Sequence, residues 1–196
     1  MGKIDGRSCY QTHKLYAALQ HIPLDRRRTA IDVGAHIGMW SWDLRKHFDR
    51  VEAFEPNDEL YDAWHLNMGS VRKVGYHMWE ESDVQRWMVA LSHSYHLVAE
   101  DKEEASLFKG YGGEGKDYWA YPLDNFLAWP HFDKVDFIKV DVEGFEKSVL
   151  EGAKEMLTKQ KPFILIEQKG LDEKRRGGPR GEAGNFLKEL GWTLKM

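Results

Sequence analysis

A short apolar segment followed by a glycine-containing turn constrains the fold of this chain more than any other stretch. Residues 29–33, Thr-Ala-Ile-Asp-Val, form an apolar run with one acid, which is typical of a buried parallel strand. Gly34 and Gly38 then mark a turn, and an amphipathic run over residues 39–48 predicts a helix. A strand, a glycine turn and a helix together present backbone N–H groups and a positive helix end to a ligand.

The next predicted strand ends in an acidic residue. Residues 50–54, Arg-Val-Glu-Ala-Phe, are followed by Glu55 and Pro56. An acid in this place can accept hydrogen bonds from both hydroxyls of a ribose. Gly34 and Gly38 are separated by three residues, whereas a dinucleotide-binding turn has the pattern G-x-G-x-x-G to make room for a pyrophosphate. The spacing therefore favours S-adenosylmethionine, which has no phosphate, over NAD.

The segment at residues 135–153, VDFIKVDVEGFEKSVLEGA, is the most distinctive in the chain. Shorter motifs accompany it at residues 54–56, 89–92, 122–126 and 161–167. Together with the glycine turn, and in the same order, these motifs resemble the FkbM family of S-adenosylmethionine-dependent methyltransferases over roughly residues 29–192. His36 departs from the family, which usually has asparagine there. The resemblance implies an α/β, Rossmann-like class I methyltransferase fold with a mostly parallel twisted sheet.

Helix and strand patterns alternate along the chain, which predicts a sheet with helices on both faces. We expect helices over residues 13–21, 39–48, 58–68, 145–157 and 183–190. We expect strands over residues 29–33, 50–55, 71–79, 86–91, 94–100, 105–109, 135–140, 162–167 and 192–195. The family fold usually ends in a hairpin of two antiparallel strands, so a single strand at 192–195 implies a shortened C-terminal edge.

The domain organisation is simple. We expect residues 1–28 to form an N-terminal helical segment that packs on a methyltransferase domain of residues 29–196. Within the first segment, the charged linker at residues 25–28, Asp-Arg-Arg-Arg, is interpreted as a solvated turn.

Acidic residues close three of the predicted strands: Glu55, then Asp141 with Glu143 following, and Glu167. Ligands of open α/β sheets bind beyond the carboxyl ends of the strands, and acids are costly to bury unpaired, so this convergence predicts a site. For methyl transfer to an oxygen, we expect Asp141 or Glu143 to take the proton of the acceptor as general base. A metal ion held by Asp141, Glu143 and Glu167 would be another way to lower the pKa of an acceptor hydroxyl, but we expect none.

We expect S-adenosylmethionine to contact the glycine turn and the neighbouring strand ends. The predicted cofactor-binding residues are Asp32, Gly34, Ala35, His36, Gly38, Ser41, Glu55, Pro56, Ala90, Leu91 and Asp141. Ala90 and Leu91 are included because the resemblance implies that their segment lies along the adenine. The acceptor also follows from the resemblance, which implies a hydroxyl of a sugar, a glycan or a sugar-bearing metabolite.

The predicted substrate-binding residues are Lys139, Glu167, Arg175 and Arg176. Lys139 shares a strand face with Asp141, so it either pairs with an acid at the site or lines the sheet. The two arginines belong to the glycine-rich segment 169–181, which carries an excess of positive charge. That segment is either a grip for an anionic sugar or a solvated loop.

Composition narrows the class of protein. With 196 residues, 42% of them hydrophobic, the chain can form one well-packed domain. No stretch approaches the roughly 18 apolar residues of a membrane span, and residues 1–5 have no apolar signal-peptide core. Cys9 is the only cysteine, which predicts a reducing compartment, so we expect a cytoplasmic protein.

Two other functions stay open at this point. Ribose 2′-O-methylation of RNA could use Lys139, Asp141 and the basic segment 174–180, although the net charge of −4 makes a nucleic-acid partner an unfavourable expectation. Alternatively, the chain could be a non-catalytic cofactor-binding module whose shortened edge is completed by a partner. Self-association into a homo-oligomer is also open.

Overall fold

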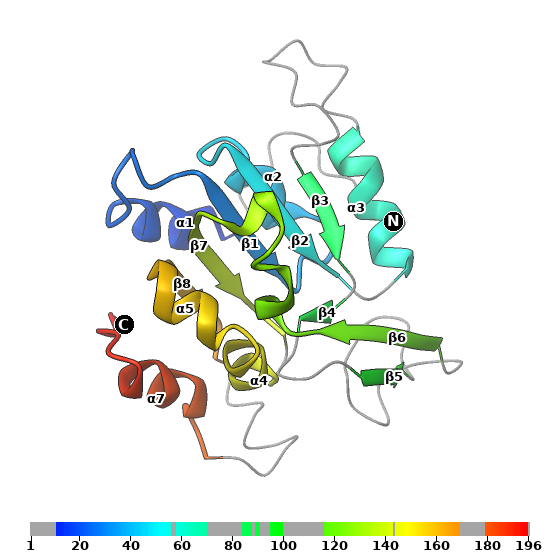
Figure 1. Ribbon diagram of the computed structural model, residues 1–196. Coiled ribbons are helices and arrows are strands. Elements are labelled where there is room, and N and C mark those ends of the chain that lie inside the picture. The colour runs from blue at the N-terminus through cyan, green and yellow to red at the C-terminus, as the bar shows by residue number, and fades with distance from the viewer. Residues whose placement is uncertain are drawn as a thin grey trace.

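The computed structural model describes residues 11–55, 58–69, 84–87, 89–90, 95–99, 116–142, 144–168 and 179–195 (Figure 1). Its main sheet has the strand order β3-β2-β1-β7-β8. The strands are β1 (Thr29–Val33), β2 (Arg50–Phe54), β3 (Val84–Trp87), β7 (Val135–Val140) and β8 (Phe163–Ile166). Each neighbouring pair is parallel, which confirms the predicted α/β fold.

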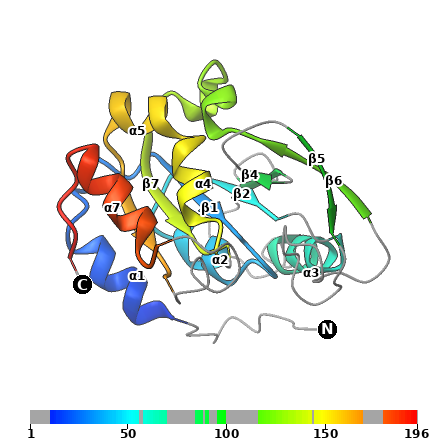
Figure 2. The same ribbon diagram turned by 90° about the horizontal axis from the view of Figure 1, so that it is seen from below.

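Helices cover both faces of this sheet. They are α1 (Thr12–Leu19), α2 (Met39–Leu44), α3 (Asp58–Gly69), α4 (Glu146–Glu151), α5 (Lys154–Gln160) and α7 (Glu182–Glu189), with short 3-10 helices η3 (Leu123–Phe126) and η4 (Pro130–Phe132). In Figure 2, α1, α2 and α3 lie on one side of the sheet, and α4, α5 and α7 lie on the other. Among the described residues, no helix combines the length and apolar character needed to cross a membrane.

The alternation of side chains along β1 explains why both faces are covered. Ala30 belongs to a buried cluster with Leu15 and Leu19 of α1, whereas Ile31 and Val33 belong to a cluster with helices α4, α5 and α7. Successive side chains of a strand point to opposite faces, so a strand with apolar side chains on both faces is buried on both. All five residues of β1 are buried accordingly.

The strands predicted over residues 86–91 and 94–100 do not both belong to the main sheet. The first is divided between β3 of the main sheet and β4 (Val89–Ala90) of a three-stranded sheet with the order β4-β6-β5. β5 (Tyr95–Ala99) pairs antiparallel with β6 (Lys116–Tyr121), so a strand exists where residues 94–100 were predicted to form one. Residues 71–79 and 105–109 lie outside the described parts of the chain.

The single helix predicted over residues 145–157 is wrong, because the chain breaks into α4 and α5 at Gly152. Glycine is a poor helix former, and a second helix start leaves new backbone N–H groups without helical partners. Asp124 of η3 accepts hydrogen bonds from two of these, the amides of Glu155 and Met156, both at 2.8 Å. The amide of Asp124 in turn donates to the carbonyl oxygen of Gly152 at 2.9 Å.

The strand predicted over residues 192–195 is also wrong, since these residues form neither a helix nor a strand. Trp192 is instead held by its side chain: its Nε1 donates to the carbonyl oxygen of Pro162 at 3.3 Å, and Lys161 Nζ lies 4.5 Å from its ring centroid. Within the described residues, β8 is the edge strand of the main sheet beyond β7.

The arginine linker is not a simple solvated turn, as the sequence interpretation had it. Asp136 of β7 is fully buried, and Arg28 Nε donates to its Oδ2 at 2.7 Å while Arg26 Nε donates to its Oδ1 at 3.3 Å. Arg27 donates to the carbonyl oxygens of Leu19 and Ile22 at 3.1 and 3.2 Å. The linker thus ties the end of α1 to the amino end of the sheet.

This cluster makes stability depend on pH. Burial alone would raise the pKa of Asp136, but hydrogen bonds from Arg28 hold it below the ordinary value. A carboxylate with a depressed folded-state pKa stabilises above its unfolded pKa of about 3.9, and that stability is lost as the pH falls through the folded pKa. Asp136→Asn should lower the free energy of unfolding by about 1–3 kcal/mol at pH 7 and flatten its decline below pH 4. Urea unfolding at several pH values measures both effects.

Asp133→Asn is the matched control, because Asp133 is a neighbouring carboxylate that is exposed. It should change the free energy of unfolding by no more than about 0.5 kcal/mol. If Asp136→Asn keeps the acid sensitivity of the wild type, the Asp136 cluster does not set it.

Candidate functional site

The candidate site lies at the carboxyl end of the main sheet, where the strand order reverses. β1 has β2 on one side and β7 on the other, so the chain after β1 turns one way and the chain after β7 the other. Open α/β sheets bind their ligands at such a reversal, beyond the carboxyl ends of the strands. Gly34 follows β1 and Asp141 follows β7, so these two residues meet at the reversal.

Gly34 makes the closest backbone approach at this site. Its φ is +76°, and a Cβ added there would lie 1.8 Å from the carbonyl oxygen of Asp141. The amide of Asp141 donates to the carbonyl oxygen of Val33 at 3.1 Å, which fixes the two chains against each other. Gly34 therefore satisfies both conditions that require glycine, a left-handed backbone and a neighbour too close for a side chain.

The turn is fastened to the end of β2 by three amides. Those of Gly34 and Ala35 donate to the carbonyl oxygen of Phe54 at 2.9 and 3.0 Å. The amide of His36, a residue with a left-handed φ of +52°, donates to Glu55 Oε2 at 2.8 Å. The predicted acid of β2 and the predicted glycine turn are thus in direct contact, and Glu55 is only 4% exposed.

Helix α3 supports the turn from outside, a role that the sequence analysis missed. Asn67 Nδ2 donates to the carbonyl oxygen of Ile37 at 2.8 Å. A Cβ added at Gly38, which has a φ of +89°, would lie 2.6 Å from Trp64 Cδ1 and 2.8 Å from Met68 Cε. The periodicity of residues 58–68 predicts a helix with a buried face, but not the atoms that this face contacts.

A buried ion pair lies beneath the turn. Lys139 Nζ is 3.0 Å from Asp32 Oδ1, and it donates hydrogen bonds to the carbonyl oxygens of Gly34 at 2.6 Å and Val33 at 3.3 Å. Ser41 Oγ donates to Asp32 Oδ2 at 2.6 Å. Of the two outcomes expected for Lys139, pairing with an acid is the one observed. Asp32 and Ser41 are fully buried, so they could affect cofactor binding only through their effect on the turn.

The remaining described acids differ in their surroundings. Asp141 is half-buried where the chain leaves β7. Glu167, after β8, forms an ion pair with Lys14 of α1 at 3.0 Å, and its amide donates to the carbonyl oxygen of Val140. Glu167 thus attaches α1 to the carboxyl edge, and its predicted contact with substrate stays a prediction.

His36 is the one described histidine of the glycine turn. Burial first, and then the positive charge of Lys139, lower the pKa of its imidazole below the ordinary value of 6.5. A lowered pKa means that the ring is neutral at pH 7. His36 therefore adds no positive charge to a site that would hold a cationic cofactor.

Several predicted site residues cannot be placed. Pro56, Leu91, Glu143, Arg175 and Arg176 lie outside the described residues. Ala90 lies in β4, where it pairs with Tyr121 of β6. Among the residues that the structure does describe, no three His, Cys, Asp or Glu side chains are grouped to hold a metal ion.

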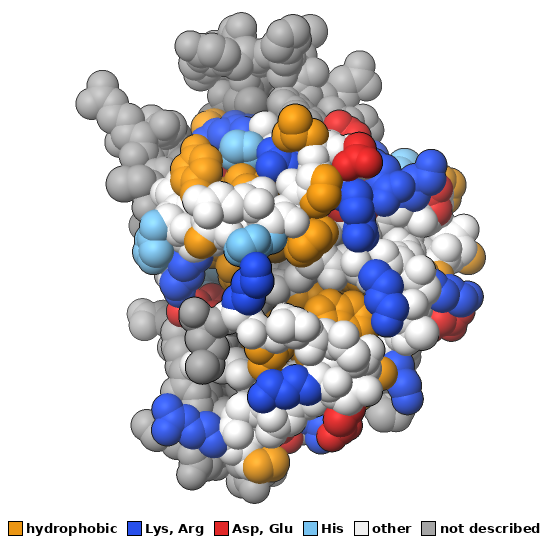
Figure 3. All heavy atoms as spheres, turned by 90° about the vertical axis from the view of Figure 1, so that its left-hand side faces the viewer, with side chains coloured by type: hydrophobic (Ala, Val, Ile, Leu, Met, Phe, Trp, Pro, Cys, Tyr) orange, Lys and Arg blue, Asp and Glu red, His pale blue; other side chains and the backbone are white. Residues whose placement is uncertain are grey.

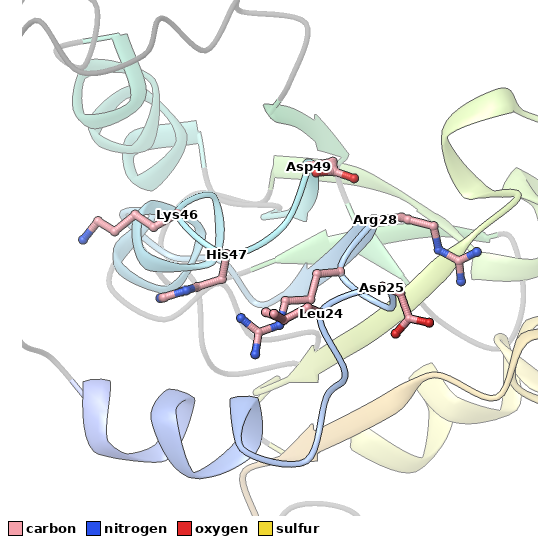
Figure 4. A pocket seen from close by; sticks show the side chains of 7 residues that line it. Leu24, Asp25, Arg28, Lys46, His47 and Asp49 are labelled. Atoms are coloured by element: carbon pink, nitrogen blue, oxygen red, sulfur yellow. The ribbon is translucent and has the colours of Figure 1, made fainter.

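A cavity of about 400 Å³ lies at the opposite end of the sheet, before β1 and β2 begin. Its lining residues are Leu24, Asp25, Arg27, Arg28, Lys46, His47 and Asp49. Figure 4 shows that Lys46 and His47 point away from Arg28, so the charged groups do not converge on one point. Arg28 is bound to Asp136 and Lys46 to Asp43, both at 2.5 Å. This cavity is distinct from the candidate site.

Replacement of Gly34 tests the close approach. Gly34→Ala should destabilise the fold more than Gly191→Ala, because both glycines have a positive φ but a Cβ at Gly191 meets nothing within 4 Å. The left-handed backbone costs an alanine about 1–2 kcal/mol at either position. Overlap with Asp141 should add about 1–3 kcal/mol at Gly34 alone. Chemical denaturation of the two variants measures the difference, and equal losses would contradict the described contact.

Comparison with known proteins gives a family and a fold. The sequence profile of the methyltransferase FkbM domain matches residues 32–191. The crystal structure of methyltransferase FkbM from Methylobacillus flagellatus KT superimposes with a TM-score of 0.50 at 19% sequence identity, over 82% of this chain and 44% of that one. This chain thus spans less than half of the length of that protein. No curated protein matches the sequence significantly.

Proposed function

Because this chain belongs to the methyltransferase FkbM family, we propose that it transfers a methyl group from S-adenosylmethionine to a hydroxyl of a sugar, a glycan or a sugar-bearing metabolite. The observation that carries the cofactor part is the contact between the glycine turn and Glu55, with the His36 amide 2.8 Å from the Glu55 carboxylate. The acceptor class rests on the family alone.

The residues present suit this cofactor. The turn after β1 comes so close to Asp141 that only glycine fits at position 34, and no second glycine at position 36 opens it for a pyrophosphate. Glu55 stands at the end of the neighbouring strand, where an acid binds ribose hydroxyls. Backbone groups of residues 34–38 would hold the amino acid end of the cofactor, and Ala90 and Leu91 would lie along the adenine.

The chemistry asked of the chain is alignment and proton removal. S-adenosylmethionine supplies a methyl group on a positively charged sulfur. Most of the work of an in-line transfer is holding donor and acceptor in register, which a rigid turn favours. A carboxylate within hydrogen-bond reach of the acceptor hydroxyl takes its proton. We propose Asp141, or Glu143 two residues later, for that role.

The residues proposed to bind the acceptor come from the sequence analysis. Arg175 and Arg176 are proposed to hold an anionic sugar, with Glu167 as a further candidate of the sequence analysis. Lys139, the remaining candidate, is buried in its ion pair with Asp32. A nucleic acid suits the chain less well, because its net charge is −4 and DNA or RNA binders gather basic residues on one face. On the face shown in Figure 3, Lys and Arg side chains are dispersed over the surface and do not form a patch.

Two variants separate cofactor binding from catalysis. Glu55→Ala removes charge-assisted hydrogen bonds worth about 1.5–3 kcal/mol each, so the Kd for S-adenosylmethionine should rise at least about 10-fold by calorimetry. Asp141→Asn should leave that Kd within a few-fold but lower turnover about 10²–10⁴-fold, if Asp141 is the base. Turnover is measured as transfer of a labelled methyl group to a panel of sugars and glycans.

Glu189→Ala, on an exposed position of α7, is the control and should change neither quantity. Unchanged affinity in Glu55→Ala would remove Glu55 from the ribose site. Normal turnover in both Asp141→Asn and Glu143→Gln would exclude these acids as the base. Tighter binding of NAD than of S-adenosylmethionine would contradict the proposed function as a whole.

A further inference from the structure

We propose that Lys139 is a positioning residue, whose buried ammonium group holds the glycine turn in its binding shape without touching cofactor or acceptor. Its side chain is 2% exposed, and its ammonium group faces the Asp32 carboxylate and two backbone carbonyls. The inference rests on the proposed function, because it takes the turn as the place where the cofactor binds. It departs from the sequence expectation that Lys139 contacts the substrate.

The three donors of the ammonium group face three oxygens. Lys139 Nζ lies 2.6 Å from the carbonyl oxygen of Gly34, 3.0 Å from Asp32 Oδ1 and 3.3 Å from the carbonyl oxygen of Val33. The two carbonyl oxygens accept hydrogen bonds from Lys139, whereas Asp32 Oδ1 is its ion-pair partner and accepts none. Two of the three partners are backbone groups of the turn and of the strand that leads into it.

The hydrogen bond from Lys139 to the carbonyl oxygen of Gly34 is the most important of these contacts, because it holds one end of a single peptide group. The carbonyl of Gly34 and the amide of Ala35 belong to the same peptide, and that amide donates to the carbonyl oxygen of Phe54 at 3.0 Å. Glycine populates positive and negative φ about equally, so this peptide has little preference of its own. Lys139 and Phe54 fix its orientation from opposite sides, which also sets the direction of the next amide, that of His36, toward Glu55.

Asp32 makes the buried charge tolerable. Its carboxylate is fully buried, pairs with Lys139 and accepts a hydrogen bond from Ser41 Oγ at 2.6 Å. A buried charge is costly unless it is paired, so the two residues depend on each other for stability. A purely structural pair could be replaced by any two neutral residues without further effect, whereas a positioning residue must be replaced by one that still donates a hydrogen bond to the turn.

Two double variants, each neutral at positions 32 and 139, distinguish a structural pair from a positioning residue. Lys139→Met with Asp32→Asn removes both charges and the donor to Gly34, whereas Lys139→Gln with Asp32→Asn removes both charges but keeps an amide donor. Each single variant leaves one buried charge and should melt well below the double variants. Both double variants should recover most of the wild-type Tm.

Cofactor affinity should depend on whether residue 139 keeps a hydrogen-bond donor, and not on the Tm of the variant. We expect the Kd for S-adenosylhomocysteine to rise about 10-fold or more in the Met pair and to stay within about 3-fold of wild type in the Gln pair, since one hydrogen bond is worth roughly that factor. Amide hydrogen exchange at Ala35, followed by NMR, should quicken about 10-fold in the Met pair alone.

The outcomes separate the alternatives. Wild-type affinity in the Met pair would make Lys139 only a charge partner of Asp32, and an equal loss in the Gln pair would show that the donor is not what matters. A raised acceptor KM with unchanged cofactor Kd would mean direct contact with the acceptor; each result overturns the proposal. If the wild type binds no S-adenosylhomocysteine, the proposed function fails, but exchange at Ala35 still decides whether Lys139 holds the turn.

Discussion

The approach of Gly34 to the carbonyl oxygen of Asp141 is the contact on which the rest of the site depends. It joins the chain that leaves β1 to the chain that leaves β7, at the point where the strand order reverses. Because no side chain fits between Gly34 and Asp141, the chain after Gly34 turns directly toward α2 and packs against α3. Glu55, Asn67 and Trp64 can meet the turn only because it takes this path.

Each end of the sheet has a buried carboxylate that forms an ion pair. At the amino end, Asp136 binds Arg26 and Arg28 and anchors the segment that carries α1. At the carboxyl end, Asp32 binds Lys139, whose other contacts are backbone carbonyls of the turn. The first cluster holds the linker after α1 to the sheet, whereas the second contacts the glycine turn between β1 and α2.

The strands, the turn and the acids at the strand ends could be predicted from the sequence, because each leaves a local signal. A short, mainly apolar segment such as Val135–Val140 predicts a buried strand, and an acid directly after it, Asp141, marks the carboxyl edge of the sheet. Partners distant in sequence leave no such signal. Arg28 and Asp136 are 108 residues apart, and Asn67 meets Ile37 across 30 residues, so the linker was misinterpreted and the support from α3 was missed. The helix break at Gly152 depends on Asp124, again from another element. The strand expected at 192–195 is not formed, because the Trp192 amide donates to the carbonyl oxygen of Leu187 in α7 and its side chain donates to that of Pro162.

In the proposed function, the carboxyl end of the sheet, and not the cavity at its amino end, binds the adenosyl cofactor. An NMR titration of the uniformly labelled chain with S-adenosylhomocysteine distinguishes the two ends, because every backbone amide reports on its own surroundings. We expect the amides of residues 34–38, Glu55 and Asp141 to shift with one common Kd, while those of residues 24–28 and 46–49 stay in place. Shifts confined to residues 24–28 and 46–49, or no shifts at millimolar ligand, would contradict it.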